Sequence, residues 1–159
     1  MRNVLGIDNG VSGSWAVVGR STWFGITPTM EQLGYQKKAK FLKRIDWKEC
    51  IKQWENLEID MVYLERPMVN PTRFEASMSA IRAFEATLIV FEHLGLGHQV
   101  LDSKAWQKEL LPEGLKGADL KKASMQKAIQ LYPHYETQIR KHKDGDAFLI
   151  AHYGLNKLS

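Results

Sequence analysis

Two short apolar segments, each ending in a carboxylate, constrain the fold of this chain most. Residues 4–8 read Val-Leu-Gly-Ile-Asp, and residues 60–65 read Asp-Met-Val-Tyr-Leu-Glu. Short apolar runs of this kind are typical of buried strands, and the Asn9-Gly10 turn and Pro67 end them. We therefore expect two buried strands that carry Asp8 and Glu65 at their carboxyl ends, where α/β sheets place their site chemistry.

The order of the other elements predicts an α/β fold with a mixed five-stranded sheet. Short connections join the first strand to strands at 14–19 and 22–26, which favours an antiparallel meander. Helices separate the later strands, 60–65 and 98–101, so these should be parallel, with helices on both faces of the sheet. Helical patterns cover residues 46–57, 74 to the Gly95 breaker, 103–110, 118–131 and 144–155.

Four carboxylates stand where these elements are expected to meet. Asp144 and Asp146 open the last helical pattern, and this helix can pack across the edge where Asp8 and Glu65 end their strands. Carboxylates that converge in this way cannot all stay ionised without a cation. Hard oxygen ligands suit Mg²⁺ or Mn²⁺, so the pattern predicts a metal site.

Each carboxylate also has a simpler interpretation. Asp8 can be a turn residue before Asn9-Gly10, and Glu65 can form a surface ion pair with Arg66. Asp144 can cap the last helix, and Asp146 can respond to the helix dipole. Their joint placement on the expected strand order favours the metal site over these separate roles.

Three motifs resemble those of the RuvC-like Holliday junction resolvases, which belong to the RNase H-like nuclease superfamily. They are Gly-Ile-Asp-Asn-Gly at 6–10, Leu-Glu-Arg-Pro at 64–67 and Asp-Gly-Asp-Ala-Phe-Leu-Ile-Ala at 144–151. Weaker likeness lies at 100–106, 121–124 and 131–133. The resemblance covers the whole chain and is greatest to the compact phage-type branch. It implies an RNase H-like sheet in which the five expected strands, numbered along the chain, lie in the order 3-2-1-4-5.

The resemblance also implies a structure-selective endonuclease that resolves four-way DNA junctions by paired nicks, using two Mg²⁺ ions per site, for which Mn²⁺ would substitute. Asp8 would bridge the ions, Glu65 would hold one and Asp146 the other. The family usually carries its last two ligands three residues apart, whereas Asp144 and Asp146 are two apart. Asp144 must therefore lie before the first regular helical turn to share a metal with Asp146, and His142 is the alternative ligand.

Binding a branched DNA requires phosphate contacts. The expected contacts are Lys104, Lys121 and Lys122, which lie in segments similar to DNA-contacting ones of the family, and the further candidates Lys116 and Arg73. Met68, or alternatively Phe74, would wedge into the junction. The basic run 37–48 is either a DNA contact or a solvated face.

The helix that begins near residue 74 carries the small residues Ala76, Ser77, Ala80 and Ala83. These would allow two copies of the helix to approach closely across a two-fold axis, and a homodimer with two sites would fit a substrate that takes two symmetric cuts. The alternative is ordinary packing of this helix on its own sheet.

Bulk properties are consistent with this hypothesis without requiring it. A chain of 159 residues fits one domain, 1–159, and a net charge of +4 permits an anionic partner. The single cysteine, Cys50, excludes an intramolecular disulfide and a cysteine-based zinc cluster. The chain shows neither a signal-peptide pattern nor an apolar run of about 20 residues. We therefore expect a cytoplasmic protein without a membrane partner, in the host cytoplasm if a phage encodes it.

Three other functions compete with junction resolution. A related nuclease could act on flaps or RNA–DNA hybrids, because the sequence does not place the surfaces that read substrate shape. An actin-like nucleotide-binding protein is a further alternative, because its phosphate-binding loop also consists of a strand, an Asp and a Gly-Ser turn, much like residues 6–14. Such proteins usually need about twice this length, because they bind the nucleotide between two related domains. A non-catalytic DNA-binding module would not need acidic residues at matched positions.

Overall fold

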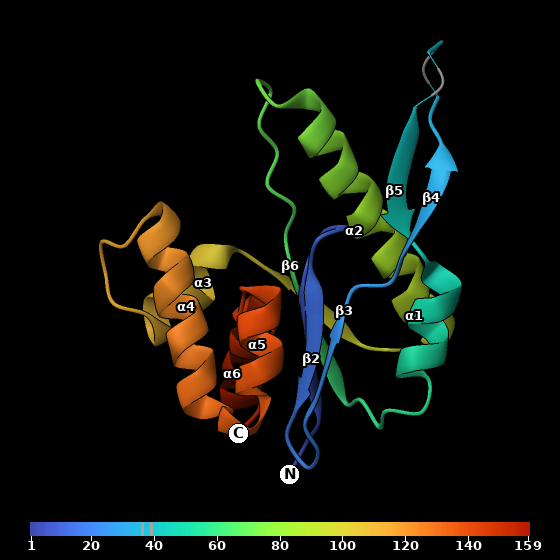
Figure 1. The fold of residues 1–159 in the computed structure, drawn as a ribbon. Coiled ribbons are helices and arrows are strands. Elements are labelled where there is room, and N and C mark those ends of the chain that lie inside the picture. The colour runs from blue at the N-terminus through green and yellow to red at the C-terminus, as the bar shows by residue number, and fades with distance from the viewer. Residues whose placement is uncertain (36, 39) are drawn as a thin grey trace.

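A computed structural model describes residues 1–35, 37–38 and 40–159. At its centre is a five-stranded sheet with the strand order β3-β2-β1-β6-β7 (Figure 1). β1 (Val4–Asp8), β2 (Ser14–Val18) and β3 (Trp23–Ile26) form an antiparallel meander, whereas β6 (Met61–Glu65) and β7 (His98–Leu101) run parallel to β1. Counted along the chain, these five strands have the predicted order 3-2-1-4-5, so the expected mixed sheet is confirmed.

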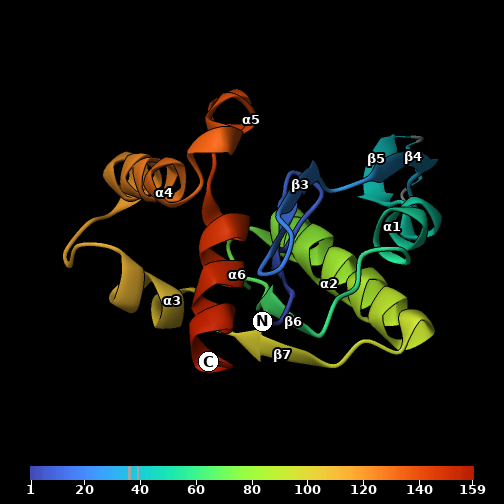
Figure 2. The ribbon, with the colours of Figure 1, turned by 90° about the horizontal axis from the view of Figure 1, so that it is seen from below.

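Helices lie on both sides of this sheet, as expected. α1 (Trp47–Trp54) and α2 (Phe74–Leu94) lie on one side, and the other side carries α3 (Ser103–Leu110), α4 (Gly117–Leu131), α5 (Glu136–His142) and α6 (Asp146–Lys157) (Figures 1 and 2). Successive residues of a strand point to opposite faces. Leu5 and Ile7 of β1 accordingly join the core under α1 and α2, while Val4 joins the core under α6.

The small residues of α6 bring this helix unusually close to β1. A Cβ atom placed on Gly6 would lie 2.3 Å from the backbone nitrogen of Ala151, and one on Gly154 would lie 2.3 Å from the ring of Tyr63. Ala147 and Ala151 are fully buried, and Gly154 is buried with them, as the predicted face of this helix requires. The close fit brings the first turn of α6 against the carboxyl end of β1.

A second, two-stranded sheet is a feature that the sequence did not predict. β4 (Thr29–Leu33) and β5 (Phe41–Ile45) form an antiparallel hairpin, and part of the basic run 37–48 therefore lies in a strand. Most side chains of both strands are exposed or half-buried, with Ile45 the buried exception. A hairpin exposed in this way lacks the alternation of apolar and polar residues by which strands are recognised. Ala39, within the basic run, lies outside the described residues.

Several element boundaries also differ from expectation. α6 begins at Asp146, not at 144, and α1 ends at Trp54, not at 57. The 3-10 turn η1 (Pro133–Tyr135) and α5 were not predicted, because α5 is short and buries only Ile139. Among the described residues, no helix is both long and apolar enough to cross a membrane.

The small residues of α2 are divided between its two sides, because Ala76 is exposed and Ala80 half-buried, whereas Ser77 and Ala83 are buried. Ser77 is 7 % exposed and Ala83 is 1 % exposed, and Ala83 belongs to the core beneath α2. These two residues therefore serve the packing of the helix on its own sheet. The large exposed apolar residues of α2 are Phe74, Met78, Ile81 and Ile89.

Candidate metal centre

Strand register brings Asp8 and Glu65 to the same edge and the same face of the sheet. Ile7 of β1 pairs with Leu64 of β6 in parallel, so the residues that follow them, Asp8 and Glu65, end neighbouring strands. Gly6 and Tyr63, two residues earlier, face α6. Because side chains alternate along a strand, Asp8 and Glu65 lie on that face as well.

The start of α6 adds two further carboxylates. Asp146 is the first residue of the helix, and Asp144 precedes it, outside the regular turns. Asp144 Oδ1 accepts a hydrogen bond of 2.7 Å from the backbone nitrogen of Asp146. The cap residue of α6 is Gly145 and not Asp144, although the Asp144 carboxylate accepts this bond from the first residue of the helix. The turn before it depends on Lys143, which ends α5 in the left-handed conformation with φ 60°.

Three of the four predicted carboxylates form a compact cluster. Carboxylate oxygens of Asp8, Asp144 and Asp146 all lie within 4.8 Å of one another. Glu65 is outside this group but near enough to raise the pKa of Asp8 by charge repulsion. The spacing of two residues between Asp144 and Asp146 is therefore compatible with convergence, because Asp144 stands before the helix.

The electrostatics of the cluster disfavour ionised carboxylates. Burial, followed by repulsion from Asp144, Asp146 and Glu65, raises the pKa of Asp8 well above its usual range. Burial is likewise the main cause that raises the pKa of Glu65 to about 7 and that of Asp146 to about 6, and neighbouring carboxylates add to both shifts. The cluster thus holds protons more tightly than isolated carboxyl groups do, as expected for anions gathered without a counter-charge.

Three side chains from α3 and α4 hold the carboxylates in place. Trp106 Nε1 donates a hydrogen bond of 2.8 Å to Glu65 Oε2, and the Ser124 hydroxyl donates to Asp146 Oδ1. Lys121 Nζ lies 3.7 Å from Asp144 Oδ2. Trp106 is buried in the core, and the sequence predicted neither its bond to Glu65 nor the role of Ser124. Both contacts join residues far apart in the chain, so no local sequence pattern predicts them.

Two alternative interpretations of the site do not match the geometry. Arg66 pairs with Asp102 and not with Glu65, so the surface ion pair expected for Glu65 is absent from the described contacts. The ring of His142 lies edge-on to Phe24, with ring centres 6.0 Å apart. His142 is not part of the cluster within the described residues, whereas Asp144 is.

The donor set fits a hard divalent cation. Every group in the cluster is a carboxylate, and the described residues bring no sulfur or imidazole ligand to it. Oxygen ligands of this kind suit Mg²⁺ or Mn²⁺ and suit zinc less well. A bound cation would also offset the repulsion that helps to raise the pKa values of Asp8, Glu65 and Asp146. The charge of the cluster and the type of its ligands therefore both favour a divalent cation.

The predicted DNA-contacting residues fall into separate groups. Lys121 and Lys122 line a concave surface of about 330 Å³ together with Arg140 and Lys143, beside Asp144. Sequence reasoning missed Arg140 and Lys143, because α5 was not predicted. Lys104, in the first turn of α3, lines another depression of about 280 Å³.

The remaining predicted contacts are exposed but scattered. Lys116 precedes α4, and Arg73 precedes α2. Met68 lies between β6 and α2 and is 81 % exposed, and Phe74 is 70 % exposed. Phe74 is therefore not the core residue that a helical stripe suggests, and both it and Met68 are free to contact a ligand.

Comparison with known proteins shows likeness in structure without likeness in sequence. No family model matches the chain, and neither does any curated protein. A solved structure of Thermus thermophilus RuvC in complex with Holliday junction substrate has a TM-score of 0.66 and 14 % identity, over 96 % of this chain and 92 % of that chain. A second structure of Thermus thermophilus RuvC has a TM-score of 0.44 and 11 % identity, over 86 % and 96 % of the two chains. The first match confirms the resemblance at the level of architecture: the chain has a RuvC-like fold.

Proposed function

We propose that this chain is a divalent-metal-dependent endonuclease that cuts branched DNA and resolves four-way junctions. The observation that carries the proposal is the convergence of carboxylate oxygens from Asp8, Asp144 and Asp146 within 4.8 Å, at the sheet edge where Glu65 also ends its strand. The fold adds support, because the protein in the similar structure is a RuvC in complex with a Holliday junction substrate.

The four carboxylates would hold the metal. Asp8 ends the central strand and has carboxylates on more than one side, so it is the best candidate to bridge two ions. Glu65 and the pair Asp144 and Asp146 would hold the outer positions. Bound Mg²⁺ would activate a water molecule and stabilise charge on the scissile phosphate. Mn²⁺ has similar ligand preferences and is expected to substitute.

The protein's own contribution is to hold these carboxylates in one orientation. Trp106 is 1 % exposed, and its hydrogen bond orients Glu65 toward the cluster. Ser124, which is 2 % exposed, orients Asp146 in the same way. Such hydrogen bonds to metal ligands keep a site in one geometry before the ion and the substrate arrive.

Phosphates of the DNA would contact the basic surface beside Asp144. Lys121, Lys122, Arg140 and Lys143 line this surface, and Lys104 would contact the DNA from the separate depression at α3. Lysines and arginines at such a surface supply most of the affinity for DNA irrespective of sequence. Lys116 and Arg73 belong to the proposal as outer contacts, and Met68 as the wedge at the branch point.

A homodimer with contacts through α2 is also part of the proposal. The exposed side chains of Ile81 and Ile89, outside the groove beside the β4–β5 hairpin, offer a face to a second copy. Sedimentation velocity would measure the mass, with Ile81→Lys and Ile89→Lys as variants that place charge on this face. A monomer at all concentrations, with and without junction DNA, would exclude the dimer.

The test is cleavage of defined DNA structures in the presence of Mg²⁺. The protein is expected to cut a four-way junction by symmetric paired nicks, and Asp8→Asn is expected to abolish cutting while leaving junction binding largely intact. Glu55→Gln, an exposed substitution at the end of α1, serves as the matched control and should cut normally.

Flap, duplex and RNA–DNA hybrid substrates decide the substrate class. Preference for the hybrid or the flap would show a nuclease with another substrate, and binding of the junction without any cleavage would show a non-catalytic module. Normal cleavage by Asp8→Asn would exclude the proposed metal centre.

A further inference from the structure

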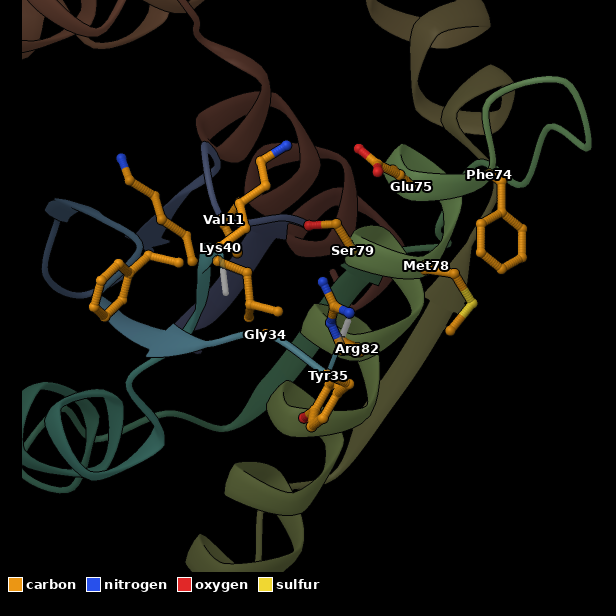
Figure 3. Close-up of a pocket in the computed structure, with 12 residues that line it drawn as sticks. Val11, Gly34, Tyr35, Lys40, Phe74, Glu75, Met78, Ser79 and Arg82 are labelled. Atoms are coloured by element: carbon orange, nitrogen blue, oxygen red, sulfur yellow. The ribbon is translucent and has the colours of Figure 1, made fainter. Parts of the chain in front are cut away.

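A groove lies between the β4–β5 hairpin and the N-terminal half of α2. It has a volume of about 360 Å³ and is lined from one side by residues of the hairpin, including Tyr35 and Lys40, and from the other by residues of α2, including Arg82 (Figure 3). The hairpin tip is closed by a hydrogen bond of 2.8 Å from Gly34 N to Lys40 O. None of the proposed metal ligands lines this groove.

The charge of the groove favours a polyanion. Lys40, Lys43 and Arg82 line it against one acid, Glu75. The hairpin segment 29–45 carries five cations, Lys37, Lys38, Lys40, Lys43 and Arg44, and a single anion, Glu31. Among the described residues, none of the three lining cations is in an ion pair. Unneutralised cations along a groove attract the backbone of a nucleic acid.

Exposed aromatic rings stand beside these cations. Tyr35 is 76 % exposed and Phe41 is 67 % exposed, and both line the groove. Both rings line one groove together with cations, and a concave apolar surface that stays exposed often marks a binding site. Cations that follow a phosphate backbone, combined with rings on which bases stack, are the features of surfaces that bind a single strand. A duplex keeps its bases stacked inside and would leave both rings unused.

The groove adjoins the carboxylate edge of the sheet. The loop that follows β1 is tied to α2, because Asn9 Nδ2 donates a hydrogen bond of 3.1 Å to Ala80 O. Val11, two residues further, lines the groove, while Asp8, directly before Asn9, belongs to the cluster. In Figure 1 the hairpin and the N-terminal half of α2 extend beyond the edge at which β6 ends. A strand held in the groove would therefore lead toward the carboxylates.

We propose that this groove binds one unpaired DNA strand, with Lys40, Lys43 and Arg82 at its phosphates and Tyr35 and Phe41 against its bases. The assignment of that strand to a branched substrate, at the point where base pairing is interrupted, rests on the proposed function. The binding of a single strand does not, since it needs no metal and no carboxylate. A second copy of the chain is the competing occupant, and the test separates the two.

The experiment measures the affinity of the full chain for a fluorescent oligothymidine and for a duplex of equal length, by anisotropy without divalent metal. Tyr35→Ala/Phe41→Ala should weaken single-strand binding about tenfold or more, and duplex binding by less than about twofold, because only unpaired bases can stack on the rings. Lys40→Ala/Lys43→Ala should weaken single-strand binding and reduce the slope of log affinity against log salt by about 1.4, as expected for two lost phosphate contacts.

The matched control is Arg2→Ala/Lys52→Ala, which removes two exposed cations that lie outside the groove and outside the basic run 37–48. It should leave single-strand affinity and salt slope unchanged. Since Tyr35 and Phe41 are largely exposed, their loss should not unfold the protein, and thermal melting checks this. Equal weakening by the control pair, or unchanged single-strand affinity in both groove variants, would overturn the proposal. So would a groove variant that converts a dimer to a monomer while its single-strand affinity is unchanged, because the occupant would then be a second copy.

Cleavage and binding can fail separately. A chain that cuts junctions in an Asp8-dependent manner, yet binds single strands equally well in every groove variant, would overturn the groove inference alone. A chain that binds single strands through the groove, yet cuts no DNA, would overturn the proposed function alone.

Discussion

Trp106 and Glu65 are joined by a hydrogen bond of 2.8 Å, from the indole nitrogen to a carboxylate oxygen of the candidate metal centre. The two residues are 41 positions apart, and Trp106 is otherwise a core residue with 1 % of its surface exposed. The bond opposes the rise in the pKa of Glu65 that burial causes. The buried Trp106 of α3 thus orients the Glu65 carboxylate at the end of β6 and favours its ionised form.

Trp106→Phe should weaken the metal site while keeping most of the buried ring. Loss of a hydrogen bond to a metal ligand typically costs about 10- to 100-fold in metal affinity or activity. The Mg²⁺ concentration for half-maximal cleavage of a junction measures the effect. In a Glu65→Gln background the same substitution should have little further effect, because the two residues act as a unit. Additive effects of the two substitutions would contradict the coupling.

Ser124→Ala should move the pH dependence of cleavage to higher pH. The Ser124 hydroxyl donates to Asp146 and lowers its pKa, so removing it leaves burial and Asp144 to raise that pKa further. Rates measured across pH at limiting Mg²⁺ would show the shift. Ser77→Ala is the control, because Ser77 is also a buried serine with a hydrogen bond, to Asn70 O, but lies on α2. A shift of the same size in the control would contradict the role of Ser124.

Without metal, the wild type should lose stability relative to Glu65→Gln as the pH rises from about 4 to about 7. Glu65 has a pKa of about 7 in the folded protein against an ordinary value of 4.5. Within that window the folded state keeps a proton that the unfolded state has released, so the stabilisation present below the unfolded pKa is lost as the pH rises through the folded pKa. Melting temperatures of both proteins in a chelating buffer measure the difference.

Added Mg²⁺ should reduce this pH dependence in the wild type, since an ion that binds the ionised carboxylates of the folded state stabilises it by mass action. If the wild type gained stability relative to Glu65→Gln over the same window, the direction of the pKa shift would be wrong.

Gly6→Ala should destabilise the protein and impair cleavage together. The added Cβ would meet the backbone of Ala151 at 2.3 Å and that of Ala147 at 2.5 Å, and backbone atoms cannot rotate away. Overpacking of this kind typically costs about 1–3 kcal/mol, and it would push α6 away from β1. Gly97→Ala is the matched control, because the nearest atom there, Met61 Sδ, is 3.9 Å away. Thermal melting and junction cleavage test both, and equal melting temperatures would contradict the prediction.

Much of this architecture could be predicted from the sequence because the strands at the centre of the sheet, β1 and β6, are short buried apolar runs. β1 and β7 match their expected ranges, and the position of Asp8 and Glu65 follows from two parallel strands that end together. Gly145 shows where local reasoning stops. Its packing against Ala128 and the Ser124 backbone places α4 beside Asp144 and Asp146, and such a contact between distant segments leaves no periodic trace in the chain.

The hairpin was missed for a different physical reason. Residues such as Lys43, Arg44 and Gln32 face solvent or one another, and Arg44 Nη1 donates a hydrogen bond of 2.5 Å to Gln32 Oε1. A strand whose apolar side chains are mostly exposed and do not alternate with polar ones carries no sign of a buried face. The groove between this hairpin and α2 therefore could not be predicted from the sequence.

Because α6 packs directly on the central strand β1, a bound cation would oppose local unfolding of this helix. Asp146 begins α6, while Asp8 ends the strand against which Gly6 receives this helix. A cation shared by the two would act as a cross-link between helix and sheet, and the helix could detach only by releasing it. Amide hydrogens of α6 should therefore exchange with solvent more slowly when Mg²⁺ is present, and those of α1, on the opposite face, should change far less.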